Sequence, residues 1–98
     1  MRTFNVAIVG LGTVGSGVYK ILKQKAALVA ERAGVRIKLV AACEKDAKKR
    51  NALRVPGSIA VNDIVRVIKD PTIDCVVELI GGKGIAKTLI LEAFKNGK

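Results

Sequence analysis

The chain contains 98 residues with a mass of 10.4 kDa, which is the size of one small domain. Half of the residues are apolar but only 3% are aromatic, so the core must be aliphatic and stacking on nucleobases is nearly excluded. With no histidine and two cysteines, the chain lacks the usual neutral-pH general base and a zinc-ligand set, so no metal site is expected.

The charge balance is strongly basic, with 18 lysines and arginines against 8 acidic residues and a net charge of +10. Such a surface favours anionic partners, although it can also be merely solvated. Nucleic acid, acidic lipid and phosphorylated metabolites are the candidate classes, and nucleic acid is not the expected one because no arm or tail concentrates the charge. The longest uncharged run is rich in glycine and resembles neither a membrane span nor a signal peptide, and we expect a cytoplasmic location.

The first half of the chain predicts a strand, a long helix and a second strand. Residues 4–9 form a near-continuous apolar run, which is typical of a strand covered on both faces. From residue 14 to Gly34 the apolar spacing is helical, and the side chains expected on the inner face are Val14, Val18, Ile21, Leu22, Leu28 and Val29. Residues 35–43 alternate and then become continuously apolar, which predicts a strand entering a buried sheet.

The second half continues this alternation of strands and helices. Residues 45–56 are polar and basic, and we expect a loop with one helical turn. A short strand over 59–61, a helix capped by Asn62 or Asp63 and ending near Lys69, and a strand over 75–80 follow. A helix over 85–96 ends at a cap formed by Gly97. This order predicts an α/β fold with an open, doubly wound parallel sheet and strand order 3-2-1-4.

The turn after the first predicted strand carries Gly10-Leu11-Gly12-Thr13-Val14-Gly15, which matches G-x-G-x-x-G within a β-α-β unit. Gly10 permits the tight turn, Gly12 lets a pyrophosphate approach the backbone, and Gly15 lets the helix pack close to the sheet. The N–H groups around Thr13 and Val14 then point at the phosphates, helped by the helix dipole. We therefore expect a Rossmann-like, dinucleotide-binding fold; a glycine-rich turn that binds nothing is the alternative.

The end of the second predicted strand is where such a fold contacts the adenosine ribose. Glu44 ends the apolar run there, and its carboxylate can accept hydrogen bonds from both ribose hydroxyls, although it lies farther beyond Gly15 than the ~20 residues that are usual. A carboxylate favours NAD, because the 2′-phosphate of NADP would bring a charge of about −2 close to it. Four basic residues follow: Lys45, Lys48, Lys49 and Arg50. They could hold this 2′-phosphate, so NADP stays possible. The alternative is that they are simply solvated.

The strand over 75–80 is expected next to the first strand, so its loop should approach the nicotinamide half of the cofactor or form a plain turn. The loop residues are Leu79, Ile80, Gly81 and Gly82. Glu78 is either functional or paired with a lysine or a backbone N–H. Cys43 and Cys75 should lie two strand spacings apart, ~10 Å, which exceeds the ~7 Å limit for a disulfide. We expect both cysteines to be small buried side chains.

Three stretches resemble the homoserine dehydrogenase family: residues 6–19, the connection 32–37, and Val-Val-Glu-Leu-Ile-Gly-Gly at 76–82. The resemblance covers essentially the whole chain, and its Glu-Leu-Ile-Gly-Gly part is more specific than the glycine motif. It implies a complete enzyme that interconverts aspartate semialdehyde and homoserine with NAD(P), on the pathway to threonine and methionine. It also implies that residues 10–15 hold the pyrophosphate and residues 79–82 line the nicotinamide ribose.

The chain departs from this family at two places and lacks its later parts. Family members often carry Arg where Glu44 stands, and many read Ile-Glu-Pro-Ala where residues 83–86 read Lys-Gly-Ile-Ala. The family's catalytic lysine, in a Thr-Ala-Asn-Lys segment, and its substrate-binding and dimerisation region lie beyond residue 98. Residues 1–98 therefore resemble the N-terminal part of a dinucleotide-binding domain with an incomplete sheet. We expect these residues alone to be inactive and to self-associate through the unpaired sheet edge. We also expect a homo-oligomer. The alternative is a stand-alone NAD-sensing module without catalysis.

Overall fold

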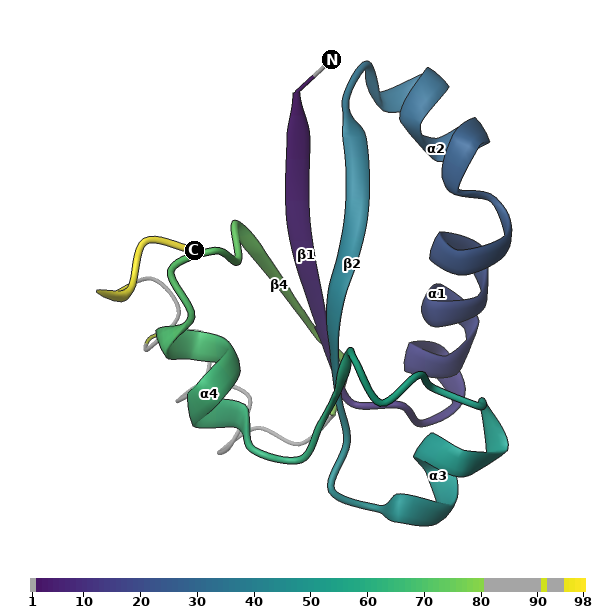
Figure 1. The fold of residues 1–98 in the computed structure, drawn as a ribbon, viewed down its shortest axis with the longest axis vertical. Helices are drawn as coiled ribbons and strands as arrows, with labels where there is room; N and C mark the ends of the chain where they lie inside the picture. The colour runs from purple at the N-terminus through teal and green to yellow at the C-terminus, as the bar shows by residue number, and fades with distance from the viewer. Residues whose placement is uncertain (1, 81–90, 92–94) are drawn as a thin grey trace.

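A parallel sheet forms the centre of the computed structural model, which describes residues 2–80, 91 and 95–98 (Figure 1). Its strands, in the part of the chain described, are β1 (Thr3–Val9), β2 (Arg36–Cys43), β3 (Ala60–Val61) and β4 (Cys75–Glu78). Their order is β3-β2-β1-β4 and every pairing is parallel. The predicted α/β class and the strand order 3-2-1-4 are confirmed.

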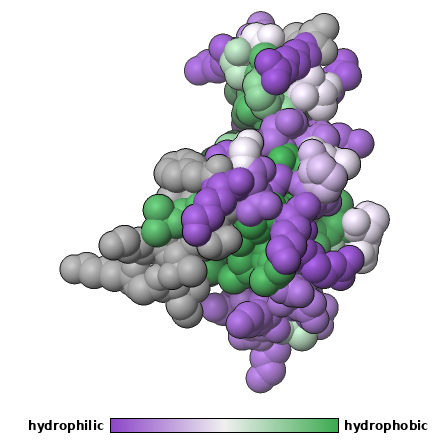
Figure 2. Space-filling model, turned by 90° about the vertical axis from the view of Figure 1, so that its left-hand side faces the viewer, coloured by the Kyte–Doolittle hydropathy of each residue, from purple (hydrophilic) through white to green (hydrophobic). Residues whose placement is uncertain are grey.

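Helices cover both faces of this sheet, as a doubly wound fold requires. On one side lie α1 (Thr13–Gln24) and α2 (Ala26–Ala33), and on the other lies α4 (Ile64–Lys69), while α3 (Ala47–Ala52) follows the carboxyl end of β2 (Figure 1). Because successive strand residues face opposite ways, Ile8 packs with Tyr19 of α1, whereas Ala7 and Val9 belong to the core on the α4 side. On the α4 side of the molecule, apolar atoms gather in the middle between hydrophilic ends (Figure 2).

The face that α1 turns toward the sheet agrees with the predicted one only in part, at Val18 and Leu22. Gly15 and Tyr19 are buried, and Val18 and Leu22 pack against the same core. These positions follow the i, i+3, i+4, i+7 pattern of one helix face. The expected inner residues Val14, Ile21 and Leu28 are instead 64%, 54% and 42% exposed. The close approach of Gly15 to the Gly10 carbonyl fixes the rotation of α1 and turns Gly15, rather than Val14, toward the sheet.

The single helix expected between residue 14 and Gly34 is divided in two at Lys25. This residue has φ −118° and ψ 25°, so the chain changes direction there, and α2 packs along the early part of β2. Lys25 takes part in both helices, because its N–H donates to the Ile21 carbonyl at the end of α1 and its carbonyl accepts from Val29 N–H at the start of α2. The predicted stop at Gly34 is confirmed, with φ 73°.

The remaining elements follow the prediction with two corrections. Asp63 caps α4 by accepting a hydrogen bond from Val65 N–H, and a short β3 is present. β4 ends at Glu78 instead of residue 80, because its neighbour β1 ends at Val9, whose carbonyl accepts the last ladder bond from Leu79 N–H.

The second correction concerns the cysteines. Cys43 is buried as expected, but Cys75 is exposed because it begins β4 at the edge of the described sheet. Both thiols are free, which confirms that they form no disulfide. The helix predicted over 85–96 lies mostly outside the described residues, while Gly97 has the left-handed φ of 76° expected of a cap. None of the helices in the described ranges has the length and apolar content needed to span a bilayer.

Candidate functional site: the turn between β1 and α1

Glycine is required at both ends of the turn that joins β1 to α1. Gly10 has φ 99°, and a Cβ there would lie 2.9 Å from the backbone nitrogen of Ile80. A Cβ on Gly15 would lie 1.8 Å from the Gly10 carbonyl oxygen, well inside contact distance. Gly10 N–H also donates to the Cys43 carbonyl at 2.9 Å, which ties the turn to β2. The turn is therefore held against both strands that flank β1.

Leu11, the second residue of the turn, is fixed by two side chains. Its N–H donates to Glu44 Oε1 at 2.9 Å, and its carbonyl accepts from Ser16 Oγ at 2.9 Å. Its own side chain is buried in the core on the α1 side. Because both backbone polar groups and the side chain are engaged, this part of the turn is ordered by the chain itself.

The beginning of α1 is open to an anion. Gly12 is the N-cap, has no side-chain capping bond, and is followed by no acidic residue in the first turn. A Cβ on Gly12 would meet nothing within 4 Å, so space lies in front of this backbone. The uncapped N–H groups of a helix carry roughly +0.5 of an elementary charge. A phosphate group fits this combination of space, donors and potential, and Thr13 and Val14 supply the first N–H groups of the helix.

Glu44 stands at the end of β2 with its carboxylate divided between two backbone donors. Oε1 accepts from Leu11 N–H at 2.9 Å and Oε2 accepts from Asp46 N–H at 3.1 Å. Burial opposes the negative charge and on its own raises the pKa of Glu44. The two backbone bonds and the nearby Lys49 outweigh burial and hold this pKa below its ordinary value. The carboxylate is thus ionised and fixed at the place where a ribose is expected.

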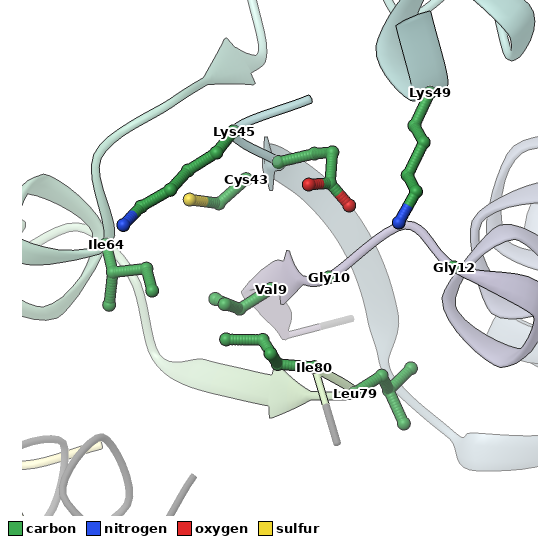
Figure 3. A pocket seen from close by; sticks show the side chains of 10 residues that line it. Val9, Gly10, Gly12, Cys43, Lys45, Lys49, Ile64, Leu79 and Ile80 are labelled. Atoms are coloured by element: carbon green, nitrogen blue, oxygen red, sulfur yellow. The ribbon is translucent and has the colours of Figure 1, made fainter. Parts of the chain in front are cut away.

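These groups line a pocket of about 230 Å³ at the carboxyl ends of β1, β2 and β4 (Figure 3). Its lining residues are Val9, Gly10, Gly12, Cys43, Glu44, Lys45, Lys49, Ile64, Leu79 and Ile80. The structure thus brings together six of the expected site residues, while Leu11, Thr13, Val14 and Gly15 belong to the adjoining turn. Gly81 and Gly82 lie outside the described residues.

The basic residues after Glu44 divide into distinct groups. Lys49 extends from α3 toward the loop that carries Gly10 and Gly12, and Lys45 extends toward Ile64 (Figure 3). Arg50 donates to the backbone carbonyl of Glu44, so it supports the chain at that residue. Lys48 is exposed and does not line the pocket.

Sequence reasoning missed the apolar wall made by Val9, Cys43 and Ile64. Burial, with smaller contributions from Asp63 and Glu44, raises the pKa of the Cys43 thiol to about 11, so the thiol stays neutral at physiological pH. The available signal was position, because Val9 and Cys43 directly precede Gly10 and Glu44 at two strand ends. On the opposite side, Glu78 accepts from Ile80 N–H at 2.6 Å, which agrees with the backbone-paired alternative.

A parallel α/β sheet with a glycine turn, an uncapped helix N-terminus and a carboxylate at the next strand end defines a Rossmann-type dinucleotide-binding domain. Comparison with known families is more specific. A family profile described as "Homoserine dehydrogenase, NAD binding domain" matches residues 10–98. The chain therefore belongs to the family of homoserine dehydrogenase NAD-binding domains.

Individual relatives agree with this assignment. Homoserine dehydrogenases from Methylobacillus glycogenes and Pseudomonas aeruginosa are 36% and 40% identical over the whole chain, which covers 24% and 22% of those proteins. A crystal structure of a homoserine dehydrogenase from Thiobacillus denitrificans superposes with a TM-score of 0.88 and 40% identity, and the chain covers 22% of it. The chain thus spans about a quarter of the length of the relatives it matches. These relatives give no support to a stand-alone sensing module.

Proposed function

We propose that this domain holds NAD for hydride transfer between the nicotinamide ring and homoserine or aspartate semialdehyde in the complete enzyme. The observation that carries the proposal is the open backbone at Gly12, facing the same pocket as the Glu44 carboxylate. The pyrophosphate lies at the start of α1, where residues 10–15 supply close approach and free N–H groups. The adenosine ribose lies beside Glu44.

The bound nicotinamide accepts or supplies the hydride, and this domain positions it. Leu79 and Ile80 line the pocket next to Gly10 and form the wall proposed for the nicotinamide half. Their apolar side chains exclude water from that side of the ring. The groups that bind the substrate and move its proton come from parts of the enzyme beyond this domain. We also propose that the enzyme is a homo-oligomer. A cytoplasmic location is proposed because both cysteines are free thiols.

Within NAD(P), we infer a preference for NAD. The ionised Glu44 carboxylate can accept from ribose hydroxyls, and such bonds to charged groups contribute roughly 1.5–3 kcal/mol each. A 2′-phosphate would remove one hydroxyl and place about −2 charge near this carboxylate. Lys45 and Lys49 attract a phosphate, but they extend to different sides of the pocket, and Arg50 is engaged with a backbone carbonyl. These three basic side chains therefore do not converge on one position where a 2′-phosphate could bind.

The test is calorimetric titration of the full-length protein with NADH and NADPH, alongside assays of homoserine oxidation. We expect the protein to bind NADH more tightly than NADPH. The Glu44→Ala variant should reduce the ratio of the two dissociation constants by at least tenfold. A matched control is Lys38→Gln, an exposed β2 residue away from the pocket. Tighter NADPH binding that weakens in Lys49→Ala and is unchanged in Glu44→Ala would contradict the preference. Absence of binding by either nucleotide would contradict the function itself.

A further inference from the structure

A second groove lies between the C-terminal half of α1 and the chain that leaves α3. It has a volume of about 310 Å³ and is lined by Tyr19, Lys20, Lys23, Gln24, Ala52, Leu53 and Arg54. It shares no lining residue with the dinucleotide pocket. The groove is therefore a separate feature of the surface.

The charges of this groove are unbalanced. Lys20, Lys23 and Arg54 line it, and no acidic residue does. In the described ranges, none of these three side chains makes an ion pair or a hydrogen bond. Three free cations around one concavity create a positive potential that a bound anion would relieve. A multivalent anion with several oxygen atoms suits three donors better than a single charge does.

Two side chains that line the groove are anchored in the hydrophobic core. Tyr19 is 5% exposed and belongs to the core on the α1 side, and Leu53 packs against the same core. Lys20 and Lys23 lie three residues apart on α1, so they project from neighbouring positions of one helix. The backbone atoms that carry all three cations are thus held in place before any ligand arrives, which lowers the entropic cost of binding.

Arg54 occupies a backbone conformation that glycine normally provides. It follows the C-cap of α3 and has φ 54°. Its N–H donates to the Asn51 carbonyl at 3.0 Å, and Val55 N–H donates to the Arg50 carbonyl at 3.1 Å. This is the hydrogen-bond pattern of a Schellman motif, in which glycine is the usual residue at this position. An arginine in a strained position points to a use for its side chain.

We propose that this groove is a binding site for a small multivalent oxyanion, of the polyphosphate or polycarboxylate class, held by Lys20, Lys23 and Arg54. Since the groove is separate from the dinucleotide pocket, the anion binds together with NADH and does not compete with it. The charges are carried by the domain itself, so the site requires no other part of the enzyme.

The test is calorimetric titration of full-length protein, already saturated with NADH, with tripolyphosphate in one arm and citrate in the other. Binding at one site per chain in either arm supports the proposal, and the tighter ligand identifies the class. Arg54→Gly should weaken this binding about tenfold while the protein remains folded, because glycine relieves the strained backbone. Lys38→Gln removes one charge from another exposed site and should leave the affinity within twofold.

Three results would overturn the proposal: no binding in either arm, binding that NADH saturation abolishes, or equal weakening by Arg54→Gly and Lys38→Gln. Loss of binding on NADH saturation would place the anion in the dinucleotide pocket. Equal weakening would show that net charge alone attracts it. NADH affinity, measured separately in the same preparation, tests the proposed function independently of this groove.

Discussion

Gly15 and Gly17 lie two residues apart in α1, yet replacing each with alanine should change stability in opposite directions. A Cβ on Gly15 would lie 1.8 Å from the Gly10 carbonyl oxygen, and this neighbour is backbone that cannot rotate away. Helix and turn must separate, which we expect to cost about 3 kcal/mol or more. A Cβ on Gly17 meets nothing within 4 Å, so alanine there should stabilise α1 by about 0.5–1 kcal/mol.

Gly12 completes the series because it separates binding from folding. Its φ of −74° suits any residue, and a Cβ meets nothing within 4 Å in the free protein. We expect Gly12→Ala to lower stability by less than about 1 kcal/mol, as is usual for alanine at an N-cap. The added methyl group would stand where the proposed site places the pyrophosphate, and overpacking of about 1–3 kcal/mol corresponds to roughly fivefold to 150-fold weaker NADH binding.

Urea denaturation followed by circular dichroism measures the three stabilities, and calorimetric titration measures NADH affinity. We expect Gly15→Ala to lose stability and binding together, Gly12→Ala to lose mainly binding, and Gly17→Ala to lose neither. If Gly15→Ala were as stable as Gly17→Ala, the contact between α1 and the Gly10 carbonyl would not hold the turn. If Gly12→Ala bound NADH normally, the pyrophosphate would not lie at this backbone.

Three further perturbations test other parts of the domain. Asp63→Ala removes the cap that accepts from Val65 N–H and should destabilise the domain by about 1 kcal/mol in urea denaturation, whereas Asp63→Asn should retain most of the stability. Arg54→Gly should raise the unfolding free energy by roughly 0.5–1 kcal/mol, and a decrease would contradict the strain at this position. Because the pKa of Glu44 is lowered on folding, its stabilising contribution is complete above its ordinary value of 4.5 and is lost as pH falls through the folded value. Glu44→Gln should therefore flatten the decrease of stability in acid, and an unchanged pH profile would refute this assignment.

The order of elements could be predicted from sequence because each boundary carries a local signal. Gly10 and Gly34 stop a strand and a helix, and Asp63 provides an N-cap with a short side chain that accepts a backbone bond. Strand order followed from general rules for right-handed crossovers. These signals act between neighbours in the chain, so one sequence is sufficient to reveal them.

Features set by tertiary contact could not be predicted in the same way. The rotation of α1 depends on one close approach between Gly15 and Gly10, whereas apolar spacing alone favoured Val14 and Ile21 as inner residues. The break at Lys25 has no glycine or proline to announce it, and it depends on how α2 packs along β2. The turn that ends α3 was likewise not predicted, because Arg54 occupies the left-handed position where a glycine would have indicated it.

Glu44 links folding of the turn to the choice of cofactor. Its carboxylate accepts from the N–H groups of Leu11 and Asp46, and leaving the partly buried Leu11 donor unsatisfied would cost about 1–3 kcal/mol. A nucleotide with two ribose hydroxyls can approach this carboxylate without disturbing either bond, because each carboxylate oxygen accepts more than one hydrogen. A 2′-phosphate would repel the carboxylate, and moving Glu44 aside would release both donors. The proposed discrimination against NADP would therefore depend on charge repulsion and also on the stability of the turn to which the pyrophosphate is assigned.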